Sequence, residues 1–289
     1  MQAQSGAAAG SRDQTAAFML SRWRVRSVVP DCGPEECEGR SAIERAARGL
    51  ARGKIVALKG VGGFQLLADA RDRCAVLRLR QGKRREEKPF AVLMSSLEMV
   101  QQYCNVNACE DEMLCSPAAP IVLLKPKQPS DLAAEVAKSS PYLGVMVPAS
   151  PLHHLLMIAY PHPVVATSGN LSDEPIAIEN GEAQERLKDV ADIFVLHDRP
   201  IARACDDSVT RACLGQPQVL RRARGYAPLP VVTPRDLRAV LAVGGHFKNT
   251  VAIAIGRKVF LSQHIGDLDT VEARYSLFPM KSFRKLVTQ

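Results

Sequence analysis

The chain has 289 residues, enough for one large domain or two smaller ones, and its 46% hydrophobic and 24% charged residues are typical of a globular protein. No apolar run approaches the roughly 20 residues that cross a bilayer, so the sequence predicts no membrane span. The net charge of +8 suits nucleic acid or a polyanionic small substrate, but an aromatic content of only 5% argues against a ribbon that binds single strands.

The N-terminal segment and the cysteines bear on the compartment. Residues 1–28 lack the apolar core of a secretory signal, and we expect them to form a disordered leader. The eight cysteines include no Cys-x-x-Cys pair, which argues against a standard zinc knuckle. Reduced thiols and a cytoplasmic location are therefore the prediction.

Apolar residues recur at helical or strand spacing through most of the chain. The spacing predicts helices over 41–52, 72–81, 96–106, 108–114, 151–158 and 180–187. Short apolar runs predict strands over 54–59, 90–94, 121–124, 143–147, 164–167, 193–196, 208–212 and 219–222. Because the two kinds of element alternate only loosely, we predict an α/β fold with a twisted, mixed sheet and flanking helices.

The composition changes after residue 228. Pro228, Pro230 and Pro234 predict a stiff linker over 229–238. Strands are predicted over 239–243, 250–255 and 258–262, with a hairpin turn at Gly256 and Arg257 between the last two. Residues 239–289 would then begin a second domain, in a segment smaller than an independent core usually requires.

Two polar segments suggest a phosphate site. The basic segment 83–88 contains Lys83, Arg84, Arg85 and Lys88 and leads directly into the predicted strand at 90–94. The second segment, 167–170, is a small-residue turn after an apolar run. Cations together with the free N–H groups and hydroxyls of a turn can hold a triphosphate, although a charge run alone is as often a solvated helix end. No Gly-x-x-x-x-Gly-Lys-Ser/Thr loop occurs, so any nucleotide would be bound by a less common route.

A third segment is rich in glycine. Gly60, Gly62 and Gly63 follow the predicted strand at 54–59. Three glycines within four residues indicate either positive φ angles or a close approach of the backbone to another group.

An ordered set of motifs resembles a known family. The motifs occupy 59–66, 83–92, 143–156, 167–176, 197–201, 205–209 and 221–228. Together they resemble the YrdC-like domain of the HypF family, the carbamoyltransferases of NiFe-hydrogenase maturation. Residues 242–250 and 261–269 resemble the opening strands of the family's next domain, an ASKHA-type carbamoyltransferase domain. The resemblance covers about residues 29–280.

The resemblance also implies a domain plan. Residues 39–228 would form the YrdC-like nucleotide-binding domain, and 29–38 a remnant of the family's zinc finger. Val29 stands at the first ligand position of that finger, so zinc is not expected there. The family's acylphosphatase-like domain has no counterpart, and we expect a chain truncated at both ends.

The resemblance implies formation of carbamoyl-adenylate from ATP and carbamoyl phosphate or carbamate, with Mg²⁺, for a HypE-like acceptor protein. The implied catalytic residues are Lys59, Lys83, Arg84, Lys88 and His154. The implied nucleotide-binding residues are Lys83, Arg84, Lys88, Thr167, Ser168, Asn170, Arg222 and Arg224. Asp206 is a candidate Mg²⁺ ligand, but a turn or cap is the favoured interpretation, and we predict no protein-held metal.

Two alternatives stay open. One is a threonylcarbamoyl-adenylate synthase of tRNA modification. The Leu-His-His sequence at 152–154 resembles the hydrogenase-maturation branch instead. The other is a non-catalytic YrdC-type module that binds double-stranded RNA, which salt-dependent binding would reveal.

Overall fold

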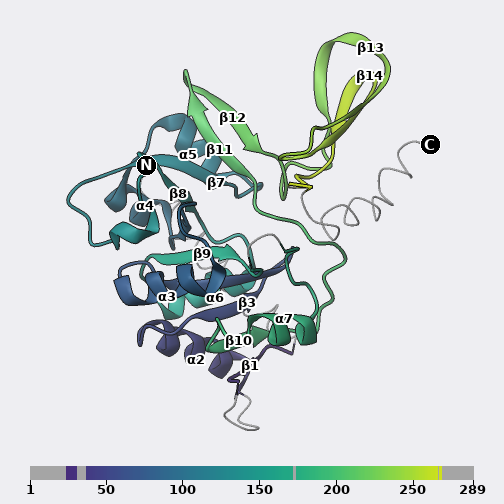
Figure 1. Ribbon diagram of the computed structural model, residues 1–289. Coiled ribbons are helices and arrows are strands. Elements are labelled where there is room, and N and C mark those ends of the chain that lie inside the picture. The colour runs from purple at the N-terminus through teal and green to yellow at the C-terminus, as the bar shows by residue number, and fades with distance from the viewer. Residues whose placement is uncertain (1–23, 31–36, 172–173, 266, 269–289) are drawn as a thin grey trace, which may run out of the picture.

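The computed structural model describes residues 24–30, 37–171, 174–265 and 267–268 (Figure 1). The strands of its main sheet are β1 (Arg26–Val28), β2 (Cys37–Glu38), β3 (Val56–Lys59), β4 (Phe64–Asp69), β5 (Ala91–Leu93), β6 (Cys104–Asn105), β7 (Ile121–Pro126), β8 (Leu143–Met146), β9 (Val164–Ser168), β10 (Ile193–Leu196), β11 (Val209–Cys213) and β12 (Gln216–Arg221). The helices are α2 (Arg40–Leu50), α3 (Arg73–Lys83), α4 (Leu97–Tyr103), α5 (Ala108–Cys115), α6 (Pro151–Ala159) and α7 (Asn180–Leu187). A 3-10 turn covers Ala134–Val136, and β13 (Val231–Val243) pairs with β14 (Val251–Leu261).

The sheet is mixed. Its strand order is β12-β11-β7-β8-β5-β9-β4-β3-β10-β1-β2, and β6 pairs with β7. The pairs β3/β10, β5/β8 and β7/β11 are parallel, whereas β4 is antiparallel to both of its neighbours. The predicted fold class, a mixed sheet with flanking helices, is therefore confirmed.

Helices cover both faces of the sheet and form two cores. Val56 and Leu58 of β3 pack with the apolar faces of α2 and α6, while Ala57 between them joins the cluster that holds the inner faces of α3, α4, α5 and α7. This alternation follows from the period of two along a strand. Because both faces are buried, the central strands are apolar throughout, which is why they appear in the sequence as short continuous runs.

The N-terminal part of the fold differs from the prediction. Residues 26–28 form β1, which pairs with β10 and β2, although they fall within the predicted leader. The predicted zinc-finger remnant contributes Cys37 and Glu38 to β2. Residues 1–23 and 31–36 of the predicted leader and remnant lie outside the described residues. The strand β4 was not predicted, because its sequence follows the glycines without a turn signal of its own.

The C-terminal segment also differs. Residues 231–238 of the predicted linker belong to β13, whose register shifts between Val232 and Leu237 accommodate Pro234. Gly256 adopts a φ of 55° inside β14 rather than at a hairpin turn, and the chain reverses over 244–250 instead.

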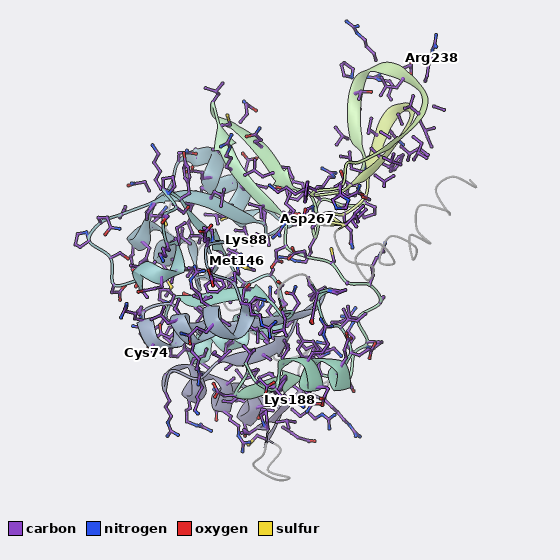
Figure 2. All side chains as sticks on the ribbon, in the orientation of Figure 1. Cys74, Lys88, Met146, Lys188, Arg238 and Asp267 are labelled. Atoms are coloured by element: carbon purple, nitrogen blue, oxygen red, sulfur yellow. The ribbon has the colours of Figure 1, made fainter. Side chains whose placement is uncertain are left out.

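The β13–β14 hairpin stands away from the main sheet. Figure 2 shows Arg238 at its far end and Asp267 at its base. Hydrogen bonds join the base to the rest of the protein. Gln263 Nε2 donates to the Ala204 carbonyl, and the His264 N–H donates to the Arg222 carbonyl, both at 2.7 Å. The hairpin is thus anchored next to the segment that follows β12.

Candidate functional site

Six segments of the chain meet around one cavity, among them Ile176 and the start of β4, which continues the glycine loop 60–63. The empty space of the cavity is about 410 Å³, part of it open to solvent. The segments also include the glycine loop, the residues before and at the start of α6, the end of β9, the segment 205–207 and Arg224. In the antiparallel pair of β4 and β9, Gln65 lies directly opposite Ser168. The strand that follows the glycine loop is therefore paired with the strand that leads into the turn at 167–170.

The turn after β9 is held against β4 by its glycine. The Gly169 N–H donates to the Phe64 carbonyl at 2.6 Å, and the Gly169 carbonyl accepts from the Ala177 N–H at 3.0 Å. A Cβ at position 169 would lie 2.8 Å from both the carbonyl carbon and oxygen of Phe64. Only a residue without a side chain permits this approach of two backbones.

We predict that Gly169→Ala destabilises the protein by about 1–3 kcal/mol, because the added methyl group meets backbone atoms that cannot move aside. Gly181→Ala is the matched control. Gly181 lies in α7, and a Cβ there would have no heavy atom within 4 Å. We expect that change to be neutral or to stabilise by up to about 1 kcal/mol, since alanine favours the helix. Urea denaturation of both variants tests the assignment, and equal midpoints would contradict it.

Lys83 fixes the same turn from the other side. Its Nζ, on a side chain only 2% exposed, donates to the carbonyls of Ser168 and Asn170 at 2.5 and 2.6 Å. Burial, with the nearby charge of Arg85, lowers the pKa of Lys83 to about 7. Lys83 does not line the cavity. Its contacts therefore support a positioning role for the turn rather than the direct phosphate contact that the sequence suggested.

Arg85 is the second cation of the basic segment that turns inward, and like Lys83 it contacts the 167–170 turn without lining the cavity itself. Its Nη1 lies 3.3 Å from the Thr167 hydroxyl oxygen, and its guanidinium lies 5.2 Å from the centre of the Phe90 ring. Burial and the charges of Arg80 and Arg221 lower the pKa of Arg85 to about 10. The lowered pKa reflects burial together with the positive charges of these neighbouring arginines. A bound anion would stabilise the charged form of Arg85.

Arg84 and Lys88, the two neighbours that the sequence favoured, are exposed. Arg84 caps α3 in the left-handed conformation. Lys88 is labelled in Figure 2. Its backbone carbonyl accepts hydrogen bonds from the side chains of Arg80 and Arg85.

The opposite wall carries two ion pairs. Arg221 pairs with Asp206 at 2.6 Å, and Arg224 pairs with Asp207 at 2.8 Å. Arg222, which was predicted to close over a nucleotide, donates instead to the carbonyls of Tyr226 and Leu229 at 2.9 and 2.7 Å. The site prediction had named Arg222 and Arg224; Arg224 lines the cavity, whereas Arg222 does not, and Arg221 reaches the site only through its ion pair with the lining residue Asp206. The chain bends where it leaves β12, and strand periodicity could not have indicated which arginine faces inward.

A buried histidine completes the polar lining. His153 Nε2 lies 2.7 Å from Gln65 Oε1, and Gln65 Nε2 donates to Asp207 Oδ2 at 2.9 Å. Burial lowers the pKa of His153 to about 4, so the imidazole is neutral at pH 7. The sequence prediction favoured His154, which is not among the lining residues. The inward position falls to His153 because it joins the buried face of α6 with Leu152 and Leu156.

We predict that His153 makes stability fall with acidity. The unfolded chain takes up this proton near pH 6.5 and the folded protein only near pH 4, so its stabilising effect is complete above pH 6.5 and is lost as the pH falls toward 4. The loss should be on the order of 3 kcal/mol. His153→Asn should show a smaller decline in unfolding free energy over this range, whatever its absolute stability. An identical decline in both proteins would contradict the prediction.

Lys59 lies behind the glycine loop. Its Nζ donates to the His197 carbonyl at 3.1 Å, the side chain is 3% exposed, and burial lowers its pKa. Lys59 is absent from the cavity lining. A role in the chemistry stays a prediction, and the contacts indicate support of the loop.

The acidic side chains do not form a cage for a cation. Among the described residues no three His, Cys, Asp or Glu side chains gather as metal ligands. Asp206 and Asp207 are each paired with an arginine. A Mg²⁺ ion would therefore have to be held mainly by the phosphates of a nucleotide, as is usual for this ion. In the same described part of the chain, no helix is both long and apolar enough to cross a membrane.

Comparison with known proteins identifies the family. The Sua5/YciO/YrdC family model, described as telomere recombination, matches residues 48–223. The chain belongs to this family. A second model, the HypF Kae1-like domain, matches residues 235–286, so a YrdC-like domain is followed by Kae1-like sequence.

Individual relatives agree with this assignment. The carbamoyltransferase HypF of Synechocystis is 47% identical over 234 residues, which cover 81% of this chain and 30% of the relative. A crystal structure of full-length HypF in a phosphate- and nucleotide-bound form matches with a TM-score of 0.83 and 44% identity, over 91% of this chain and 34% of that one. The threonylcarbamoyl-AMP synthase of Xanthomonas axonopodis is 32% identical over 141 residues, which cover 47% of this chain and 74% of the relative.

These matches confirm the predicted resemblance of this YrdC-like chain to HypF. The chain spans about a third of the length of its HypF relatives.

Several residues at the site were not among the predicted ones: Gln65, His153 and Asp207, which line the cavity, and Arg85 and Arg221, which contact residues beside or in its lining. His153 had a usable signal, because it lies next to Leu152 and three residues before Leu156 on the apolar face of its helix. Gln65 carried no such signal, since its position depends on pairing between distant strands.

Proposed function

We propose that this chain binds ATP at the cavity and forms carbamoyl-adenylate from carbamate, which hydrolysis of carbamoyl phosphate by water supplies with release of inorganic phosphate. The observation that carries the proposal is the cavity lined by the glycine loop and Ser168, together with the half-buried guanidinium of Arg85, which contacts Thr167 one residue before Ser168. Positive charge, free backbone N–H groups and close backbone approach are what a triphosphate requires. The nucleotide-bound state of the HypF structure supports this choice of ligand.

The reaction requires little acid–base chemistry. A carbamate oxygen attacks the α-phosphorus, the bond between the α-phosphorus and the bridging oxygen breaks, and pyrophosphate leaves with its negative charge. Arg85 and Arg221 supply positive charge along the phosphates, and Lys83 keeps the turn at 168–170 in place. Mg²⁺, where it accompanies ATP, adds charge neutralisation on the phosphates. Catalysis then rests on positioning and electrostatic stabilisation.

The wider role is proposed on the same basis. HypF relatives are carbamoyltransferases, so we propose that the adenylate serves hydrogenase maturation, with a HypE-like protein as the final acceptor. The competing candidate is a threonylcarbamoyl-adenylate synthase, because the Xanthomonas relative has that activity in its name. That relative matches less of this chain than the HypF relatives do, and at lower identity.

Pyrophosphate release tests the choice between them. The chain is incubated with ATP and Mg²⁺ and either carbamoyl phosphate, ammonium carbamate, or threonine with bicarbonate. We expect release with the first two donors and background release with the third. Release only with threonine and bicarbonate would establish the competing function, and no release with any donor would contradict both.

A further inference from the structure

Gln65 occupies a special place in the cavity. It is half-buried, it lines the wall, and it stands opposite Ser168 on the neighbouring strand. Opposed residues of an antiparallel pair have Cβ atoms about 4.5–5.5 Å apart. A group that contacts Gln65 would therefore lie within a few ångströms of the turn that is proposed to hold phosphate.

The orientation of the Gln65 amide is fixed from both ends. Because the Ala149 N–H lies 3.5 Å from His153 Nδ1, we assign the histidine proton to Nε2, which then donates to Gln65 Oε1 at 2.7 Å. At the other end Gln65 Nε2 donates to Asp207 Oδ2. A flipped amide would set donor against donor at His153 and acceptor against acceptor at Asp207.

Asp207 is itself held in place. Arg224 donates to Asp207 Oδ1 through Nε at 3.0 Å and through Nη2 at 2.8 Å. Arg224 Nη2 also donates to the Ala119 carbonyl at 3.0 Å. The chain of contacts from His153 to Arg224 thus leaves the Gln65 amide no freedom to rotate.

The fixed amide keeps unused hydrogen-bonding capacity. A primary amide has two N–H donors and two acceptor lone pairs, and the contacts with His153 and Asp207 use one of each. Within the described part of the chain, one donor and one lone pair therefore remain for a ligand. A carbamoyl group carries the complementary set, with N–H donors beside a carbonyl oxygen in one plane.

The remaining walls suit a small planar group. The glycine loop 60–63 brings backbone close to the cavity, and Gly62 packs so tightly that a Cβ there would lie 2.2 Å from the Cys205 carbonyl oxygen. Ile176 supplies an apolar surface. Besides Gln65, the polar lining comprises Ser150, His153, Ser168, Asp206, Asp207 and Arg224.

We propose that Gln65 recognises the carbamoyl group by pairing its remaining N–H and carbonyl lone pair with the substrate's carbonyl and amino group, and that His153 is the positioning residue that fixes it. This inference rests on the proposed function, since it assigns the acyl-binding part of the same site. Gln65 would contact the substrate, whereas His153 would act only through Gln65.

The test separates recognition of carbamate from ATP binding. Exchange of labelled pyrophosphate into ATP is measured at saturating ATP and varied ammonium carbamate for the wild-type chain and for Gln65→Leu, with the Kd for ATP measured in parallel. We expect the KM for carbamate to rise about tenfold to a hundredfold, because the substrate loses its pairing partners in a desolvated site, with the ATP Kd within about twofold. Gln102→Leu, on the exposed surface of α4, is the matched control and should change neither value.

His153→Leu provides the second variant. It frees the amide to rotate, so we expect a smaller rise in the KM for carbamate and again an unchanged ATP Kd. If Gln65→Leu leaves that KM unchanged while the wild-type chain is active, or shifts the ATP Kd in parallel as a structural defect would, the inference is wrong and the proposed function stands. Absence of exchange by the wild-type chain would overturn both.

Discussion

Arg85→Ala is expected to weaken ATP binding by about 10- to 150-fold. The expectation follows from the loss of a charge-assisted contact, worth about 1.5–3 kcal/mol, in a half-buried position beside Thr167. The protein should stay folded, because the bonds that Arg85 makes to the carbonyls of Lys88 and Pro89 are on the exposed side of the segment. Calorimetric titration with ATP and Mg²⁺ measures the effect.

Arg84→Ala is the control for this prediction. Arg84 carries the same charge one residue earlier but is exposed, so removal of its side chain should change the ATP Kd by no more than about threefold, as is usual for a screened surface charge. Both variants remove one positive charge, so a difference between their ATP Kd values reports the position of the side chain rather than the net charge. If both changes weaken binding equally, long-range charge rather than direct contact is responsible, and Arg85 loses its assigned role.

Arg80→Met should cause the largest loss of stability, about 3–5 kcal/mol, because it leaves the buried Val136 carbonyl and four partly buried carbonyls without their donor. Arg80 is 6% exposed and lies 4.4 Å from the centre of the Phe90 ring. Its guanidinium donates to the carbonyls of Arg85, Glu86 and Lys88 at 3.0, 3.2 and 3.1 Å, and to those of Glu135 and Val136 at 2.7 and 3.2 Å. One side chain thus shapes the whole basic segment, and its loss should also reduce ATP affinity.

Arg78→Met, on the same helix, is the matched control. Arg78 is exposed and makes surface contacts with Asp192 and the Gly53 carbonyl, which should contribute less than about 1 kcal/mol. Urea denaturation compares the two variants. Similar midpoints for Arg80→Met and Arg78→Met would show that the carbonyl contacts do not hold the segment.

The central strands were predictable because both faces of the sheet are buried. A short, continuous apolar run such as 193–196 is typical of a strand covered on both faces, and α7, predicted as a polar helix, has the predicted bounds. The strands β1 and β2 were not predictable in the same way. They are short, and their places depend on β10, more than 150 residues away.

The site was predictable by segment but not by side chain. The glycine loop and Ser168 of the turn at 167–170 line the cavity, and the basic segment contacts that turn through Lys83 and Arg85. Within these segments His153 rather than the predicted His154 lines the cavity, Arg85 rather than Arg84 contacts Thr167, and Arg221 rather than Arg222 pairs with Asp206. In each case the choice depends on how a helix end or a bent strand is rotated by its packing, which a pattern of residue types does not encode.

Exchange of labelled pyrophosphate into ATP tests the proposed adenylate formation most directly, because it requires a reversible adenylate and no acceptor protein. We predict exchange that depends on the chain, on Mg²⁺ and on carbamate, and that Arg85→Ala strongly reduces. An intact, ATP-binding chain that gives no carbamate-dependent exchange would contradict the proposal.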